Sequence, residues 1–173
     1  MTKGNIAFID GQNVHLAVQE SRWQIDYRKF RVWLKDKYKV SEAYYFPGYF
    51  NENYQDIYTM LQKAGFITEF KEHTDLHAST KKGNIDTLMI FKIMYKLLKE
   101  SDGFNNIVIV SGDGDFYPVV EFLIKEDRFE KILHPTKKSA SSLYKELSSK
   151  YYDILGNQAI RSRIAYTKKE KGS

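Results

Sequence analysis

Short apolar runs and helical patterns alternate along this chain from one end to the other, and this alternation limits the possible folds more than any other feature. The runs at residues 6–9 and 107–110 contain only Ile, Val, Ala and Phe, which predicts buried strands. Elsewhere apolar residues recur at helical spacing, as Phe30, Trp33 and Leu34 do. Strands that alternate with helices form α/β domains. The sequence therefore predicts an α/β fold, a three-layer sandwich with a mainly parallel central sheet.

The same patterns predict where each element begins and ends. Strands are expected at residues 6–10, 41–46, 66–72, 107–110, 131–133 and 152–155. Helices are expected at residues 13–20, 27–38, 53–64, 84–100, 117–125 and 139–150. The helix at 84–100 is apolar nearly all round, apart from a stripe of lysines, so we expect it to be mostly buried. Residues 73–82 show no periodicity and are expected to form an exposed loop.

Composition excludes several classes of protein. The chain has 173 residues, 42% of them hydrophobic, which suits one folded domain rather than a disordered polypeptide. It contains no Cys, so disulfides, zinc–thiolate sites and cysteine nucleophiles are excluded. The first strand begins too early for a signal peptide, and no apolar run approaches the roughly 18 residues of a membrane span. We therefore expect a soluble, cytoplasmic protein with no membrane partner.

The net charge of +5 is concentrated at the C-terminus. Residues 161–173 hold five basic side chains and one acidic one, which leaves about +1 for the rest of the chain. We therefore expect a folded domain at residues 1–156, followed at 157–173 by a basic tail with the composition of a disordered arm. Such a tail would either contact nucleic acid or simply keep the terminus in solution.

Acidic residues follow the two strongest strand predictions. Asp10 ends the first strand, Asp113 and Asp115 follow the strand at 107–110, and Asp86 lies in the first turn of the long helix. In an open α/β sheet, the loops past the carboxyl ends of the strands form the ligand crevice. Carboxylates crowded there repel one another, and without His or Cys beside them they suit a hard cation. The sequence therefore predicts a site for Mg²⁺ or Mn²⁺.

Each of these residues also has a purely structural explanation. Asp10 can end its strand while Asn13 caps the next helix, and Asn13 can equally ligate a metal or orient Asp10. Asp86 gains from the dipole of its helix. One of the two later aspartates can cap the helix that follows, but a cap needs only one acid. The hydroxyl of Ser111, two residues before Asp113, could orient a metal-bound water or a phosphate oxygen.

Taken together, three segments resemble the NYN domain, the LabA-like branch of the PIN-like nuclease superfamily. They are FIDGQN at 8–13, KGNID at 82–86 and SGDGDF at 111–116, and a late KKSASSL at 137–143 adds to the likeness, which covers about residues 5–155. The resemblance implies a PIN-like fold with strand order 3-2-1-4-5 and metal-dependent RNA cleavage. It further implies an acidic metal pocket made by Asp10, Asp86, Asp113 and Asp115, supported by Asn13 and Ser111. No additional RNA-binding module is recognisable, so the resemblance does not define which RNA is cut.

Other residues are less specific. Lys81 and Lys82 could contact an RNA backbone from a flap at 73–83, whereas His73 and His77 in the same loop are more typical of a solvated pair. Aromatic residues after the second strand could stack on bases or support a homodimer, but their density is more typical of core packing. They are Tyr44, Tyr45, Tyr49, Phe50 and Tyr54.

Two functions compete with RNA cleavage. A regulator that binds RNA or protein could use the same fold with little or no turnover. A phosphatase of the haloacid-dehalogenase type is suggested by the Gly-Asp-Gly-Asp at 112–115, but it requires a second Asp two residues after the first one. This chain has Asp10 followed by Gln12, so the phosphatase ranks well behind.

Overall fold

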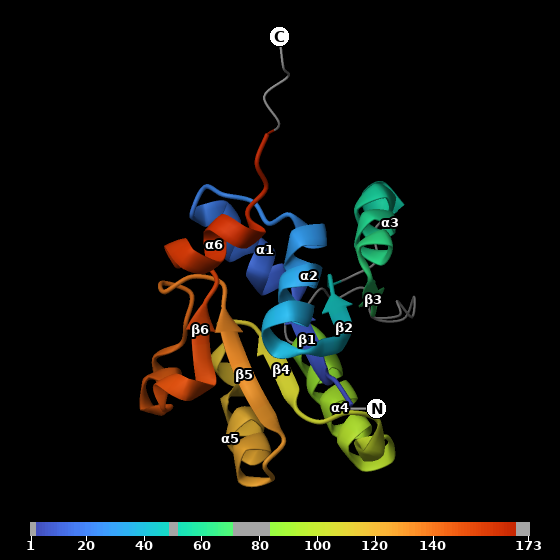
Figure 1. Ribbon diagram of the computed structural model, residues 1–173, viewed down its shortest axis with the longest axis vertical. Helices are drawn as coiled ribbons and strands as arrows, with labels where there is room; N and C mark the ends of the chain where they lie inside the picture. The colour runs from blue at the N-terminus through green and yellow to red at the C-terminus, as the bar shows by residue number, and fades with distance from the viewer. Residues whose placement is uncertain (1–2, 49–51, 71–83, 169–173) are drawn as a thin grey trace.

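The computed structural model describes residues 3–48, 52–70 and 84–168, and these form an α/β domain around one sheet (Figure 1). The sheet contains six strands in the order β3-β2-β1-β4-β5-β6, and every neighbouring pair is parallel. The predicted order 3-2-1-4-5 is therefore confirmed, with β6 added beside β5. The strands are β1 (Asn5–Asp10), β2 (Val40–Phe46), β3 (Phe66–Thr68), β4 (Ile107–Val110), β5 (Phe129–His134) and β6 (Tyr152–Ile154).

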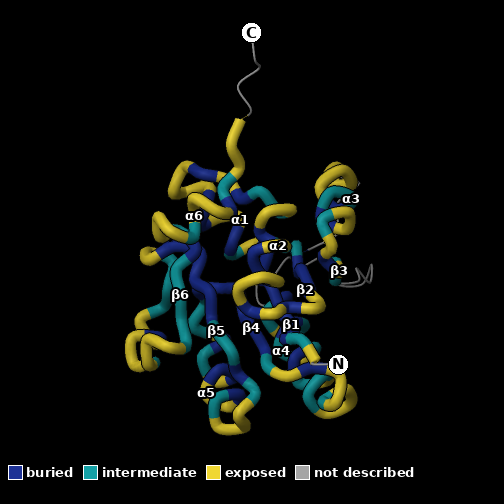
Figure 2. Tube along the Cα trace, viewed as in Figure 1, coloured by how far each residue is buried: buried dark blue, intermediate teal, exposed yellow. Residues whose placement is uncertain are grey.

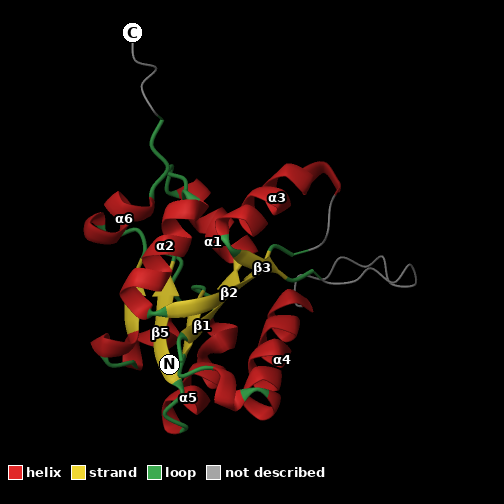
Figure 3. Ribbon diagram, turned by 45° about the vertical axis from the view of Figure 1, so that its right-hand side comes forward, coloured by secondary structure: helices red, strands yellow, loops and turns green. Residues whose placement is uncertain are grey.

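Helices cover both faces of the sheet, which gives three layers (Figure 3). They are α1 (Gly11–Glu20), α2 (Tyr27–Tyr38), α3 (Gln55–Ala64), α4 (Asn84–Lys99), α5 (Tyr117–Lys125) and α6 (Gln158–Ile164). Short 3₁₀ helices are η1 (Glu52–Tyr54), η2 (Ser101–Gly103), η3 (Gly114–Phe116), η4 (Ser142–Glu146) and η5 (Ser149–Tyr151). One buried cluster joins α1, α2, α3 and α6 to the sheet, and a second joins α4 and α5 to its other face.

The two central strands lie deepest in the molecule. Every residue of β1 and of β4 is buried, as Figure 2 shows for the middle of the sheet. A parallel sheet covered by helices on both faces requires strands that are apolar on both sides, which explains the unbroken apolar runs in the sequence. The site described below lies at the carboxyl ends of these two strands.

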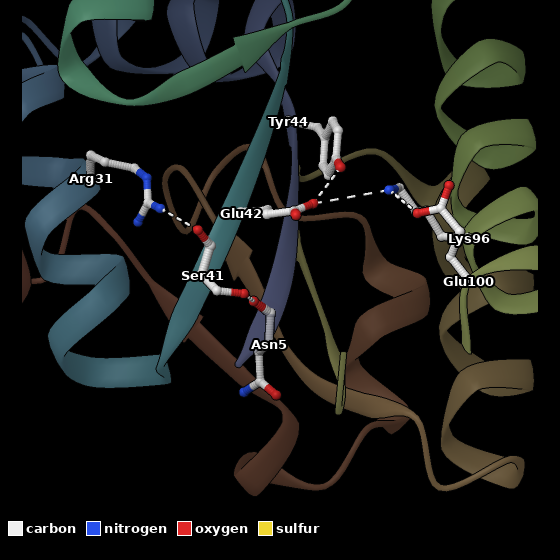
Figure 4. Close-up of polar contacts among 7 residues, drawn as sticks. All are labelled: Asn5, Arg31, Ser41, Glu42, Tyr44, Lys96 and Glu100. Atoms are coloured by element: carbon white, nitrogen blue, oxygen red, sulfur yellow. Dashed lines mark hydrogen bonds and ion pairs between the residues drawn. The ribbon is translucent and has the colours of Figure 1, made fainter. Parts of the chain in front are cut away.

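Polar contacts on β2 attach a helix to each of its faces (Figure 4). On one side Arg31 of α2 donates from Nη2 to the carbonyl oxygen of Ser41 at 2.9 Å. On the other side Lys96 of α4 pairs with Glu42 at 3.9 Å and also with Glu100. The ion pairs of Lys96 contribute little to stability, because their acidic partners are nearly half exposed, and the two apolar clusters hold α2 and α4 on the sheet.

Three expectations from the sequence are wrong. The basic tail does not begin at 157, because residues 158–164 form α6, and its Ile164 is fully buried against the α1–α2 layer. About two turns of helix carry too little periodicity to be detected in a segment rich in charge. The adjacent Ala165 also forms an isolated antiparallel bridge with Ile25.

The predicted helix at 139–150 is instead two 3₁₀ helices, η4 and η5. Ser141 caps η4 through its side chain, and its backbone N–H donates to the carbonyl of Gly112 at 2.9 Å. Serine hydrogen-bonds to nearby backbone and so competes with a regular helix, and here a tertiary contact uses that preference.

The third wrong expectation concerns α4, which is not mostly buried. Its buried face consists of Ile85, Met89 and Ile93, whereas Phe91 and Leu98 on the opposite side are 59% and 75% exposed. A helix on one face of a sheet buries only one stripe, whatever the composition of its other side.

The third strand is confirmed but short, since it ends at Thr68. The predicted flap at 73–83 lies outside the described residues. Within the described part of the chain, no helix has the length and apolar character needed to cross a membrane.

Candidate metal centre

The topology of the sheet brings two acidic loops together. Strands β1 and β4 are neighbours, with Ile9 paired to Val110, so the residues that follow them emerge side by side. Asp10 is the last residue of β1 and Ser111 the first after β4, and the Ser111 hydroxyl donates to Asp10 Oδ2 at 2.9 Å. Asp86 comes to the same end of the sheet because α4 packs against β1 with its first turn beside these loops.

Three carboxylates then form a cluster. One oxygen each from Asp86, Asp113 and Asp115 lies within 4.8 Å of the other two. Asp86 and Asp113 are half-buried, and Asp115 is exposed. Oxygen ligands at such separations can be bridged by a single divalent cation, since each would need only a small movement to reach about 2.1–2.4 Å. We call Asp86, Asp113 and Asp115 the acidic cluster.

Asp10 lies next to the acidic cluster and does not belong to it. Its side chain is only 4% exposed, and both carboxylate oxygens accept hydrogen bonds. Oδ1 accepts from the backbone N–H of Asn13 at 3.2 Å, and Oδ2 accepts from Ser111. The four aspartates predicted from the sequence are therefore gathered in one place, three as a cluster and one behind it.

The electrostatics of this place favour a cation. Burial, and then the charges of Asp10, Asp113 and Asp115, raise the pKa of Asp86 to about 7. Burial also raises the pKa of Asp10, an effect opposed by its hydrogen bonds and increased by Asp113. Among residues 3–48, 52–70 and 84–168, no Lys, Arg or His forms a salt bridge with any of the four. An all-oxygen set of acids without a basic partner fits a hard ion such as Mg²⁺ or Mn²⁺.

Asn13 and Ser111 hold the two loops in register. Asn13 Oδ1 accepts from the backbone N–H of Gly112 at 2.9 Å, which links the start of α1 to the loop after β4. The Ser111 Oγ also accepts from the backbone N–H of Asp113 at 3.1 Å. Both residues therefore act on the aspartates through hydrogen bonds that orient the backbone.

Two residues at the site were missed by the sequence analysis. His134, the last residue of β5, is buried and donates from Nδ1 to the carbonyl oxygen of Ser111 at 3.0 Å. Tyr144 of η4 donates its hydroxyl proton to the carbonyl oxygen of Asp113 at 2.6 Å. No sequence pattern links either residue to the aspartates, because both contacts depend on the position of β5 beside β4.

Glycine is required where the segment after β5 crosses the aspartate loop. A Cβ atom on Gly112 would lie 2.2 Å from the carbonyl oxygen of Ser139, far inside contact distance. The serine-rich segment at 137–143, noted in the sequence, thus packs directly on the acidic loop. Lys81 and Lys82, predicted to meet RNA, lie outside the described residues.

Comparison with known proteins agrees with this geometry. The family model of the NYN domain matches residues 6–155, a span that includes all four aspartates. The chain is 24% identical over 171 residues to the low amplitude and bright protein LabA of Synechococcus elongatus, covering 94% of this chain and 88% of that protein.

A crystal structure of a protein of unknown function from Vibrio parahaemolyticus has the same fold. Its TM-score is 0.74 at 18% identity, over 95% of this chain and 97% of that one. At this identity the likeness concerns the fold alone. The family match indicates a type of domain as well as a fold, since the NYN domain is a nuclease-type domain of the PIN-like superfamily. This chain belongs to the NYN domain family.

Proposed function

We propose that the protein is a metal-dependent endoribonuclease that hydrolyses RNA phosphodiester bonds with Mg²⁺ or Mn²⁺. The observation that carries this proposal is the acidic cluster at the carboxyl ends of the central strands, with its oxygens within 4.8 Å of one another. Membership of a nuclease-type family supports the same chemistry and leaves no role for the phosphatase alternative.

Asp86, Asp113 and Asp115 would hold the ion, and Asp10 would add negative charge from behind them. A divalent ion in this place supplies electrostatic stabilisation of a phosphoryl group and makes a water molecule more acidic. The chain's own contribution is orientation. Asp10 holds the Ser111 hydroxyl, Ser111 holds the backbone of Asp113, and Asn13 holds Gly112. These contacts keep the ligand carboxylates in one arrangement before substrate arrives.

The remaining parts of the proposal concern the substrate. Lys81 and Lys82 precede α4 in the sequence, and we propose that they contact phosphate groups of the RNA. Their charge would attract a polyanion to a site that is otherwise negative. A cytoplasmic location is part of the same proposal.

The test is cleavage of labelled single-stranded and hairpin RNA with Mg²⁺, Mn²⁺ or EDTA. Wild type should cut with metal and not with EDTA. Asp113→Asn should lose activity by more than about 100-fold, because even residues that only support metal ligands cost 10- to 100-fold when removed. Asp102→Asn is the matched control, since Asp102 is an exposed acid in η2 with the same chemistry and no place in the site.

Full activity of Asp113→Asn in the presence of metal would refute the assignment of the acidic cluster. RNA binding without cleavage by wild type, with either metal, would favour a binding regulator on the same fold. If wild type neither bound nor cleaved RNA, RNA would be excluded as the ligand of this protein.

A further inference from the structure

A second concave surface lies apart from the aspartates. A cavity of about 530 Å³ opens on the outer side of α2, next to the end of α6, which packs against α2 in Figures 1 and 3. It contains none of the residues of the metal centre. We call it the basic groove, and its lining residues are Arg28, Lys29, Val32, Trp33, Asp36, Lys37 and Arg163.

The charge of the basic groove is strongly positive. Four basic side chains and one acidic side chain line it, whereas the chain as a whole carries only +5. All four basic residues are exposed, and within the described part of the chain none of them forms a salt bridge. The ammonium group of Lys29 donates to two uncharged oxygens, the Ala165 carbonyl at 3.3 Å and Thr167 Oγ1 at 3.5 Å. The groove therefore carries positive charge with which no acidic side chain of the described residues forms a salt bridge.

The groove is also held rigidly. Ile160 packs against the core before Arg163, and after it Ile164 is fully buried and Ala165 pairs with Ile25, so the segment that carries Arg163 is anchored on both sides. Trp33 forms the floor, 6% exposed, with its ring stacked on Phe30 at a centroid distance of 6.2 Å. A surface that is already ordered loses little entropy when a ligand binds.

The chemistry of the lining indicates what it would bind. Arginine forks and lysine ammonium groups match the oxygens of phosphate. Trp33 presents almost no ring surface, so the groove has no platform on which a base could stack. Contacts to phosphates position a nucleic acid without reading its sequence. The expected ligand is thus a sugar–phosphate backbone.

The sequence that follows the groove has the same character. Thr167, which contacts Lys29, is followed by Lys168, Lys169 and Lys171, with Glu170 as the one acid among them. Arg163 lies in the segment that the sequence predicts to be a basic tail, yet it lines the groove itself. The positive charge of the C-terminus is therefore continuous in sequence with a built surface.

We propose that the basic groove binds the sugar–phosphate backbone of RNA, independently of base sequence, at a place separate from the metal centre. The proposal takes RNA as the ligand from the proposed function. It adds a second contact that holds the substrate whether or not metal is bound at the aspartates.

The test is fluorescence anisotropy with a labelled single-stranded RNA of about 12 nucleotides, a length within the range covered by single-strand binding surfaces. EDTA is present, so that neither cleavage nor metal contributes. Arg28→Glu/Arg163→Glu should weaken binding at least about tenfold, and equally for RNAs of different sequence. It should also reduce the salt dependence of binding, by about 0.7 in slope for each phosphate that the variant no longer neutralises.

Two further variants control this measurement. Lys63→Glu/Lys125→Glu makes the same change in net charge on exposed last-turn residues of α3 and α5, and it should keep wild-type affinity. Arg28→Gln/Arg163→Gln removes the charges without reversing them, which keeps the test valid if the glutamate variant does not fold. The melting temperature of each variant identifies folding failures.

The outcomes separate this proposal from the proposed function. Weaker RNA binding in the groove variants, but not in the Lys63 and Lys125 control, supports RNA binding by the basic groove. This holds even if the wild-type protein never cleaves RNA with any metal. Equal loss in the Lys63 and Lys125 control, unchanged affinity in both groove variants, or no RNA binding by wild type in EDTA would each overturn it. The cleavage assay on wild type and Asp113→Asn then decides about the metal centre separately.

Discussion

Asp10 and Asp113 each combine a helix cap with a second contact at the candidate metal centre. Asp10 caps α1 and Asp113 caps η3, each accepting a backbone N–H through one carboxylate oxygen. A carboxylate has two oxygens and about four lone pairs, so a cap does not exhaust it. Asp10 uses its second oxygen for Ser111, and Asp113 also contributes a carboxylate oxygen to the acidic cluster. The capping role that the structure shows therefore leaves room for the proposed role in the metal site.

Asp86 should make the stability of the metal-free protein depend on pH. The native state raises the pKa of Asp86 from 3.8 to about 7, so it favours the protonated form more than the unfolded state does. The free energy of unfolding should therefore fall as pH rises from 3.8 to about 7, and the loss is complete above that range.

Asp86→Asn cannot ionise, so in EDTA at about pH 8 it should melt at a higher temperature than wild type. At about pH 4.5 the two melting temperatures should converge. Thermal melts followed by circular dichroism measure this, with Asp102→Asn as the control that should show no such pH-dependent gain. Identical melts of wild type and Asp86→Asn at every pH would contradict the raised pKa.

Gly112 should tolerate no side chain. Gly112→Ala would bring a Cβ to 2.2 Å from the Ser139 carbonyl oxygen, a backbone atom that cannot rotate away. We expect a loss of about 1–3 kcal/mol in the free energy of unfolding, the usual cost of overpacking, together with displaced aspartates and lower cleavage activity. Gly103→Ala is the matched control, since nothing lies within 4 Å of its Cβ position. Urea denaturation of both variants compares the two costs.

At the scale of elements, α6 belongs to the folded domain. It packs Ile164 into the α1–α2 layer and places Arg163 at the basic groove. Ile164→Ala should lower the free energy of unfolding by about 2–5 kcal/mol, as expected for a fully buried aliphatic side chain. Tyr166→Ala, just beyond the helix and 55% exposed, should change it by less than about 0.5 kcal/mol. A flexible terminal segment would show no such difference in urea denaturation.

At the scale of the whole molecule, charge is divided between two surfaces. The acidic cluster lies at the carboxyl ends of β1 and β4, and the basic groove lies on the α2–α6 layer. An RNA strand attracted to the positive surface would still meet repulsion at the aspartates. A divalent cation bound at the aspartates would remove that repulsion. The basic groove and the metal centre would then both attract the same RNA strand, which they do only when metal is present.

Metal should therefore stabilise the molecule in a pH-dependent way. Mg²⁺ at a fixed concentration should raise the melting temperature more at about pH 8 than at about pH 5.5. Protons compete with the ion for Asp86 below its pKa of about 7, and a ligand that binds only the native state stabilises it. Asp113→Asn should lose most of this increase, whereas Asp102→Asn should keep it. An equal increase at both pH values would show that Asp86 takes no part in binding the ion.

Local sequence patterns were enough to predict the fold class, the parallel sheet and the positions of most elements. Continuous apolar runs of this length are typical of strands buried on both faces, and helical periodicity with end signals such as Gly65 is local information. The same local patterns marked Asp10, Asp113 and Asp115, because each ends or follows a buried strand, whereas Asp86, in the first turn of a helix, joined them through the resemblance to the NYN domain.

Which of these acids lie together, and which residues hold them in place, depends on the tertiary structure. The division between the acidic cluster and Asp10, the contacts of His134 and Tyr144, and the basic groove all join residues far apart in the chain. The spacing of residue types along the chain does not reveal such contacts, because the contacts depend on strand order and on how the helices pack. The exposed side of α4 and the short helix α6 illustrate the same limit, because burial is a property of neighbours in space.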